Sequence, residues 1–254
     1  MTALPNFWLI IPAAGVGSRM GASLPKQYLT VATQTVLEHT ADCFLTLPNL
    51  LGAVIATSAE DSYWPTLTLA QHPKVIHSLG GKERADTVFL ALKTLQNHGA
   101  LADDWVLVHD AARPNLAQSD LFKLLYEVSQ SNAAGGILAY RAKDTLKRQW
   151  PNSQALASIE QTIDRSVIWH ALTPQMFRLG TLLNCLEHAL QQGLNITDES
   201  SAIEAAGLSV RLVEGRSDNY KITYPEDLAI FQQQLKTKVW LLNPAHLNKS
   251  AIKR

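Results

Sequence analysis

The sequence has little of what would draw a protein to nucleic acid, to a membrane or to an oxidising compartment. Its 22 basic and 22 acidic residues give a formal net charge of +0, so no overall basic field is expected to attract nucleic acid or anionic lipid. The 2 cysteines, Cys43 and Cys185, lie far apart in patterns typical of amphipathic helices, and we interpret both as packing residues. No apolar run approaches the roughly 20 residues that span a bilayer, and no secretory pattern begins the chain. We therefore expect a cytoplasmic protein that binds neither nucleic acid nor membrane.

Two familiar phosphate-binding motifs are also absent from the glycine-rich stretch near the N-terminus. The dinucleotide fingerprint needs a glycine where Met20 stands, and the Walker loop needs Gly-Lys-Ser/Thr, which this stretch lacks. The apolar run from Phe7 to Ile11 is typical of a strand buried on both faces, and Pro12 cannot continue a central ladder. Gly15 and Gly17 then allow backbone N–H groups to approach an anion closely. The stretch predicts a turn that cradles a polyphosphate, most simply a triphosphate.

Positive charge accompanies this turn. Arg19 lies inside it and Lys26 follows Pro25, so both can meet the phosphates. The pattern A-A-G-x-G-x-R-M-G with Pro-Lys close behind resembles the opening signature of nucleotidyltransferases that join a nucleoside triphosphate to a sugar or polyol phosphate. The alternative is an ordinary βα turn with two glycines.

Strand and helix patterns alternate along the rest of the chain. Apolar runs predict strands at 51–57, 74–79, 105–108, 134–139 and 209–214, and helical spacing predicts helices at 28–47, 88–95, 121–128 and 178–190 and after Pro225. This alternation predicts an α/β fold, a Rossmann-like and mostly parallel sheet with helices on both faces. We expect a single nucleotidyltransferase domain over residues 1–235 and a C-terminal extension over 236–254.

Two further turns follow predicted strands and carry polar groups. Gly80 and Gly81 end the 74–79 strand, and Asp110 follows the 105–108 strand directly after His109. Ligands of open α/β sheets lie across the carboxyl ends of the strands, so these turns should share one crevice with the first loop. Mg²⁺ is typically held by one or two carboxylates plus phosphates, which makes Asp110 a candidate metal ligand. The alternative is an aspartate that caps the next turn and pairs with Arg113, and we interpret His109 as structural.

Residues 140–171 are polar, and the run 157–165 has the period of a strand. This segment is too polar on one face to be core. It predicts either a loose loop outside the sheet or an arm that a second subunit completes.

A series of motifs in this order and at these distances resembles the family of 2-C-methyl-D-erythritol 4-phosphate cytidylyltransferases: PAAGVGSRMG, PKQYL, GGKERADTV, VHDAARP, DTLK, LTPQMF, ITDE and GRSDNYKITYPEDL. The resemblance covers roughly Leu9 to Ile230. It implies transfer of CMP from CTP to 2-C-methyl-D-erythritol 4-phosphate, giving 4-diphosphocytidyl-2-C-methyl-D-erythritol and pyrophosphate in the non-mevalonate pathway of isoprenoid biosynthesis. It also implies Mg²⁺ or another divalent cation, and a homodimer clasped by the arm.

The resemblance and the loop chemistry together predict the site residues. We expect catalytic roles for Lys26, Lys221 and Arg19. The expected nucleotide-binding residues are Pro12, Ala13, Ala14, Gly15, Val16, Gly17, Ser18, Arg19, Lys26, Gly80, Gly81, Lys82, Arg84, Thr87, Asp110 and Ala111, with Asp110 also the metal ligand. The expected substrate-binding residues are Asp110, Arg113, Thr145, Arg165, Thr173, Thr197 and Lys221. Thr145 and Arg165 match arm positions that the family places in the neighbouring subunit's site, and Thr197 matches a hydroxyl that faces the substrate phosphate.

Three alternatives stay open. A ribitol-5-phosphate cytidylyltransferase would share these loops, although the stretch 168–175 and the Thr-Asp-Glu motif favour methylerythritol phosphate. A nucleotide-binding regulator without catalysis would not need Lys26, Asp110 and Lys221 together. A purely structural or adaptor domain would leave the charges at strand ends unexplained. Ser18, Lys82 and Thr87 differ from residues common in the family, which affects contact detail but not the reaction.

Overall fold

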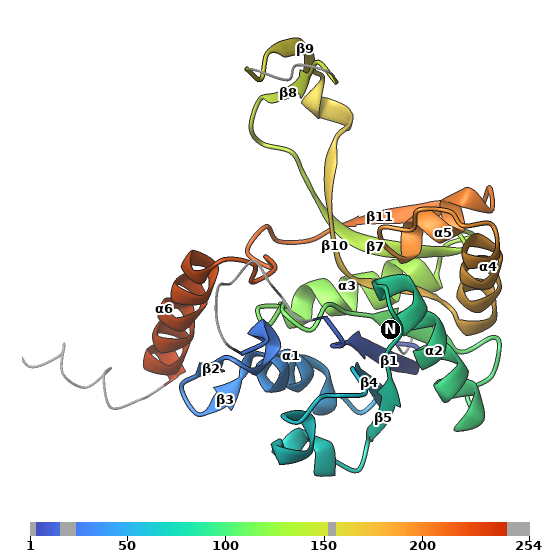
Figure 1. The fold of residues 1–254 in the computed structure, drawn as a ribbon, viewed down its shortest axis with the longest axis vertical. Helices are drawn as coiled ribbons and strands as arrows, with labels where there is room; N and C mark the ends of the chain where they lie inside the picture. Colours follow the sequence, from blue (N-terminus) through green and yellow to red (C-terminus); the bar gives the residue numbers. More distant parts are fainter. Residues whose placement is uncertain (1–3, 16–23, 152–155, 243–254) are drawn as a thin grey trace, which may run out of the picture.

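The computed structural model describes residues 4–15, 24–151 and 156–242, and a seven-stranded sheet lies at its centre (Figure 1). In sheet order the strands are β11 (Val210–Glu214), β7 (Gly135–Arg141), β10 (Trp169–Arg178), β6 (Trp105–Val108), β1 (Phe7–Pro12), β4 (Leu50–Thr57) and β5 (Val75–Leu79). Every neighbouring pair is parallel except the two that involve β10, which runs antiparallel to both β6 and β7. The mostly parallel sheet expected from the sequence is confirmed.

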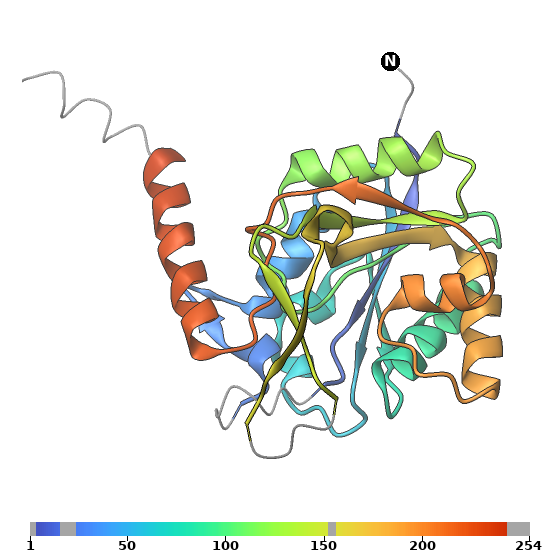
Figure 2. The same cartoon turned by 90° about the horizontal axis from the view of Figure 1, so that it is seen from above.

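Helices cover both faces of this sheet. They are α1 (Val36–Leu45), α2 (Arg84–Asn97), α3 (Gln118–Ser129), α4 (Leu179–Gln191), α5 (Glu199–Ala205) and α6 (Pro225–Leu242). Leu9 and Ile11 of β1 pack with α1 and α3 in one cluster, whereas Ile10 packs with α2, α4 and α5 in the other. Figure 2 shows α3 on one side of the sheet and α4 and α5 on the other. Because successive side chains of a strand point to opposite faces, β1 must be apolar throughout, as its sequence is.

The helix expected over 28–47 is wrong in its first part. The chain instead forms a short 3-10 turn over Lys26–Tyr28 and a two-stranded ribbon of β2 (Thr30–Val31) and β3 (Gln34–Thr35) before α1 begins. Thr35 sets this beginning, since its hydroxyl accepts from the Glu38 N–H while the Glu38 carboxylate accepts from the Thr35 N–H. A local capping box therefore overrides the longer helical pattern.

Two other boundaries differ from expectation. Helix α2 begins at Arg84, earlier than the predicted start at position 88, and the Asp86 carboxylate accepts from the Glu83 N–H in its first turn. Strand β10 has no counterpart among the predicted strands. Its first residues are partly exposed and its later ones buried, so it lacks one uniform pattern.

Between β7 and β10 the described residues, 142–151 and 156–168, leave the sheet as an arm. Strands β7 and β10 lead into an antiparallel hairpin of β8 (Leu146–Gln149) and β9 (Ile159–Ile163), which stands away from the body (Figure 1). At the base of the arm the Arg141 guanidinium lies over the Trp169 ring, 4.3 Å from its centroid. The excursion expected from composition is thus an ordered arm in its described part.

Helix α6 continues through position 236, where the resemblance was expected to fade, and ends at Leu242. Its Phe231 packs on Ile222 and Val31 in a small third cluster. No helix within the described residues is both long and apolar enough to cross a membrane.

Candidate active site

A pocket of about 300 Å³ opens at the carboxyl ends of the parallel strands β1, β5 and β6. The segments that follow these strands form its walls, as expected for a parallel sheet. The residues that line it are Pro12, Ala13, Ala14, Gly15, Lys26, Gln27, Gly81, Lys82, Glu83, Arg84, Thr87, Asp110, Ala111, Ala112 and Lys221.

At this pocket Lys26 links an early segment of the chain to a late one. Its Nζ donates to the carbonyl oxygen of Ile222 at 2.8 Å, which brings it beside the segment that carries Lys221. Two ammonium groups therefore face one cavity, and the cavity is suited to an anion with several charges.

The first two loops pack against each other through Gly80. A Cβ atom at Gly80 would lie 2.4 Å from the Cβ of Ala14, so only glycine permits this approach. The Thr87 hydroxyl accepts from the Gly81 N–H and donates to the Glu83 carbonyl, both at 3.0 Å. In this structure the Thr87 hydroxyl therefore organises the second loop, with its proton engaged there.

Asp110 is a buried carboxylate surrounded by three cations. Its Oδ1 lies 3.3 Å from Arg84, and its Oδ2 lies 3.1 Å from Arg113 and 3.2 Å from Lys221. Burial by itself raises the pKa of Asp110, but Arg84, Lys221 and Arg113 together hold that pKa well below its usual range. The carboxylate is therefore ionised at neutral pH. It makes the pair with Arg113 expected from the structural alternative, and two more besides.

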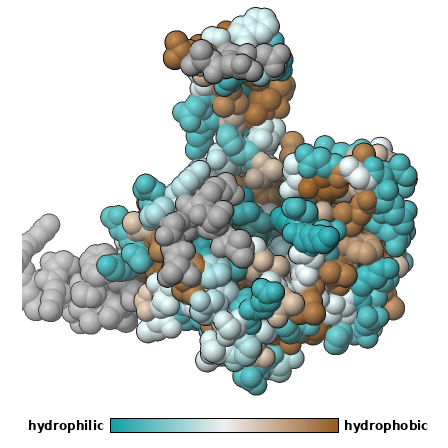
Figure 3. Space-filling model, in the orientation of Figure 1, coloured by the Kyte–Doolittle hydropathy of each residue, from teal (hydrophilic) through white to brown (hydrophobic). Residues whose placement is uncertain are grey.

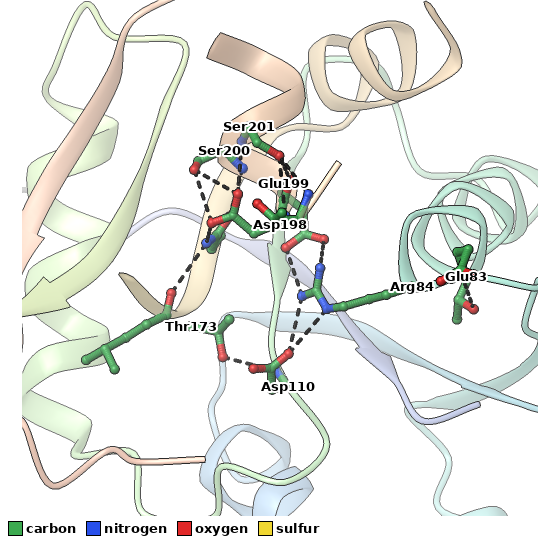
Figure 4. A network of polar contacts seen from close by, with 12 residues as sticks. Glu83, Arg84, Asp110, Thr173, Asp198, Glu199, Ser200 and Ser201 are labelled. Carbon is green, nitrogen blue, oxygen red and sulfur yellow. Dashed lines mark hydrogen bonds and ion pairs between the residues drawn. The ribbon is translucent and has the colours of Figure 1, made fainter. Parts of the chain in front are cut away.

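The polar network extends from Asp110 through Arg84 to the start of α5 (Figure 4). Glu199, which is 1% exposed, accepts from Arg84 at 2.5 and 3.0 Å. The Gln175 side chain donates to Asp198 at 2.8 Å and accepts from the Ser200 N–H at 2.9 Å. The TDE segment is thus fixed to β10 and, through Arg84, to the pocket.

His109 lies behind the pocket in a chain of hydrogen bonds. Its Nε2 donates to the Arg113 carbonyl and its Nδ1 accepts from the Thr173 hydroxyl, each at 3.0 Å, while that hydroxyl oxygen accepts from the Asp110 N–H. Burial lowers the pKa of His109 to about 4, so the imidazole is neutral at pH 7. Its burial and its hydrogen bonds agree with the structural interpretation of His109.

The model of the IspD family, 2-C-methyl-D-erythritol 4-phosphate cytidylyltransferase, matches residues 7–237. The chain belongs to this family. The enzyme of that name from Ectopseudomonas mendocina (strain ymp) is 56% identical over 90% of this chain and 95% of its own, and that from Pseudomonas putida (strain GB-1) is 54% identical over 92% and 97%. The crystal structure of the Francisella tularensis 2-C-methyl-D-erythritol 4-phosphate cytidylyltransferase superposes with a TM-score of 0.76 at 34% identity, covering 89% of this chain and 99% of that one.

In this cytidylyltransferase chain the pocket gathers most of the predicted nucleotide-binding residues. Those lining it are Pro12, Ala13, Ala14, Gly15, Lys26, Gly81, Lys82, Arg84, Thr87, Asp110 and Ala111, together with Lys221. Gly80 stands behind the wall, where it packs on Ala14. Val16, Gly17, Ser18 and Arg19 lie outside the described residues.

The predicted substrate-binding residues of this cytidylyltransferase divide into two groups. Arg113 and Thr173 contact Asp110 directly. Thr197 is exposed at the start of α5, and Thr145 and Arg165 are exposed on the arm, away from the pocket of their own chain (Figure 1). The guanidinium of Arg165 donates to the Lys143 carbonyl.

Sequence reasoning missed several residues of the site. Gln27, Glu83 and Ala112 line the pocket, and Glu199 anchors Arg84. Gln27 stands beside Lys26 in the motif PKQYL, and Glu199 stands in ITDE, so their motifs could have marked them.

Proposed function

We propose that this protein transfers CMP from CTP to 2-C-methyl-D-erythritol 4-phosphate and releases pyrophosphate, with the described pocket as its active site. Family membership supports the reaction and both substrates. The observation that carries the assignment of the site is that Lys26, Lys221 and the ionised Asp110 line the same pocket, with Lys221 3.2 Å from Asp110.

The chemistry of such a site rests on positioning and charge. A phosphate nucleophile is already ionised near neutral pH, so its attack on the α-phosphorus of CTP needs no strong general base. The neutral, buried His109 agrees with this, because it stands behind the pocket wall. We assign Lys26, Lys221 and Arg19 to stabilising the charge that spreads over the phosphate oxygens.

Asp110 is the residue that we propose holds Mg²⁺. The residues fit the ion, because Mg²⁺ usually binds one or two carboxylates plus substrate phosphates, and Asp110 presents an ionised carboxylate at the pocket wall. No group of three His, Cys, Asp or Glu side chains suited to a metal occurs in the described part of the chain, so phosphate and water oxygens would complete the shell. When bound, the ion would neutralise phosphate charge.

We further propose a homodimer in which each arm reaches the partner's site. The arm exposes Ile159 (61%) and Val167 (72%), and apolar side chains gather on it (Figure 3). Thr145 and Arg165 stand on the same arm, so the assembly would bring them to the second subunit's polyol phosphate. A cytoplasmic location completes the proposal, and a sequence with only 2 cysteines, Cys43 and Cys185, is compatible with a reducing compartment.

The decisive experiment is an assay of purified protein with CTP and Mg²⁺, following pyrophosphate release. We expect turnover with 2-C-methyl-D-erythritol 4-phosphate and little with ribitol 5-phosphate. A preference for ribitol 5-phosphate would favour the related cytidylyltransferase, and CTP binding without turnover on either would favour a regulator.

A further inference from the structure

The turn Lys26–Tyr28 carries three consecutive anchors. Lys26 faces the pocket and donates to Ile222, Gln27 contacts the first loop, and Tyr28 contacts the loop after β4. Each residue of the turn thus joins a different part of the molecule, although only Lys26 carries a charge.

Gln27 has two backbone acceptors in the first loop. Its Nε2 donates to the carbonyl oxygen of Ala13 at 2.8 Å and to that of Gly15 at 3.0 Å. The residue is 4% exposed and lines the pocket beside the two carbonyl groups that it binds. One side-chain amide therefore fixes the spacing of two alternate peptide groups in the loop.

These contacts matter electrically for a loop that binds an anion. A carbonyl oxygen carries partial negative charge, and an unpaired one near a triphosphate repels it, whereas N–H groups attract it. The Gln27 amide pairs both carbonyl oxygens and adds the positive end of its own dipole on the same side.

The far side of the turn is fixed as firmly. The Tyr28 hydroxyl donates to Asp61 at 2.5 Å, and the other oxygen of Asp61 accepts the N–H groups of Tyr63 and Trp64, each at 3.0 Å. Burial, with Asp61 beside it, raises the pKa of Tyr28, so the hydroxyl keeps its proton and stays a donor. The residue next to Gln27 is thereby anchored to the loop that follows β4.

We propose that Gln27 is a positioning residue for the nucleotide, which pairs the Ala13 and Gly15 carbonyl oxygens and couples the first loop to Lys26. This inference rests on the proposed function of the pocket. It assigns Gln27 no contact with reacting atoms, because its amide protons are directed at the loop.

The test replaces Gln27 in the full-length protein and measures CTP binding by calorimetry and steady-state kinetics. Gln27→Glu removes both donors and adds a negative charge between two carbonyl oxygens, so we expect the Kd and KM for CTP to rise about tenfold or more. Protonation of the new carboxyl restores one donor, so the variant's kcat/KM relative to wild type should increase as pH falls. The matched control is the same change at the exposed Gln130, Gln130→Glu, which should leave the Kd and the KM for CTP unchanged.

Gln27→Met, which has similar length and no donor or charge, covers the case in which Gln27→Glu fails to fold. A weaker affinity for CTP in this variant, with its melting temperature near that of wild type, supports the positioning role. Wild-type CTP affinity in a folded Gln27 variant overturns the inference and leaves the proposed function standing if wild-type protein turns over. Failure of the wild-type protein to bind CTP overturns both.

Discussion

Arg84 and Glu199, separated by 115 positions in the sequence, form a two-point ion pair in which the nitrogen–oxygen distances are 2.5 and 3.0 Å. Burial lowers the pKa of Arg84, but the neighbouring carboxylates of Glu199 and Asp110 raise it by more. The guanidinium is therefore permanently charged. The pair joins the first residue of α5 to the first residue of α2 at the pocket. The segment that carries Thr197 is thus connected, through the Arg84 guanidinium, to Asp110.

We expect Glu199→Gln to lower both stability and turnover. The change leaves Arg84 with one anionic partner, and because its side chain is 28% exposed, the expected cost is limited to about 1–3 kcal/mol of unfolding free energy. Chemical denaturation measures this cost. Glu127→Gln, which breaks the exposed pair with Arg211, is the control and should cost less than about 1 kcal/mol. Equal costs for the two variants would contradict a special role for Glu199.

Asp110→Asn should abolish most turnover, because it removes the anionic ligand proposed for Mg²⁺ while keeping the shape of the side chain. Pyrophosphate release in saturating Mg²⁺ measures the loss of turnover. Near-normal turnover would contradict the proposal that Asp110 binds Mg²⁺.

The same variant also has a pH signature. Since the folded-state pKa of Asp110 lies below its unfolded value, the carboxylate stabilises the fold above about pH 4 and this contribution is lost as pH falls further. The difference in unfolding free energy between wild type and Asp110→Asn should therefore narrow below about pH 4.

His109 should dominate a second pH effect on stability. Burial lowers its pKa from 6.5 to about 4, so the unfolded chain binds a proton that the folded one rejects. Unfolding free energy should fall by about 3 kcal/mol as pH decreases from about 6.5 to 4. Denaturant titrations of wild type and His109→Gln across this range provide the comparison, and parallel curves for the two proteins would show that His109 is not the group responsible.

Lys26→Ala and Lys221→Ala should depress the chemical step more than CTP affinity. A fixed ammonium in a partly dry cleft stabilises charge that is redistributed as the nucleophile approaches the α-phosphate. By analogy with loss of one preorganised donor, kcat should fall by about 10²–10³ for Lys26→Ala. Kinetics with CTP varied to saturation separate the possibilities, because full recovery of kcat at high CTP would mean that the lysines only bind substrate.

Arg165 and Lys26 should complement each other between subunits. Mixed dimers of Arg165→Ala and Lys26→Ala chains have one site with both lesions and one with neither, provided that the arm acts on the partner. Activity should then reappear on mixing. Proven exchange of subunits without any recovery would count against a shared site.

The class of fold could be predicted from the sequence, and so could the edge of the sheet at which the pocket lies. Residues 105–108 form a strand with the predicted bounds because a strand buried on both faces is a continuous apolar run. The glycine turns and Asp110 follow such strands, so a parallel sheet brings them to one edge whatever the details of packing. Lys26 and Lys221 could be placed there for the same reason.

Which charged side chains pair with one another, and which strand runs antiparallel, could be established only from the folded structure. Arg84 and Lys221 reach Asp110 from distant segments, and no local pattern encodes such contacts, whereas the pair with Arg113 lies within one turn and could be anticipated from the sequence. The antiparallel β10 escaped prediction because its first three residues are partly exposed at the base of the arm and the next six are buried in the core, which mixes the two patterns. Gln27 is an ordinary polar residue in the sequence. Its hydrogen bonds to Ala13 and Gly15 join positions that are 14 and 12 residues apart in the sequence, and they become visible only in the folded chain.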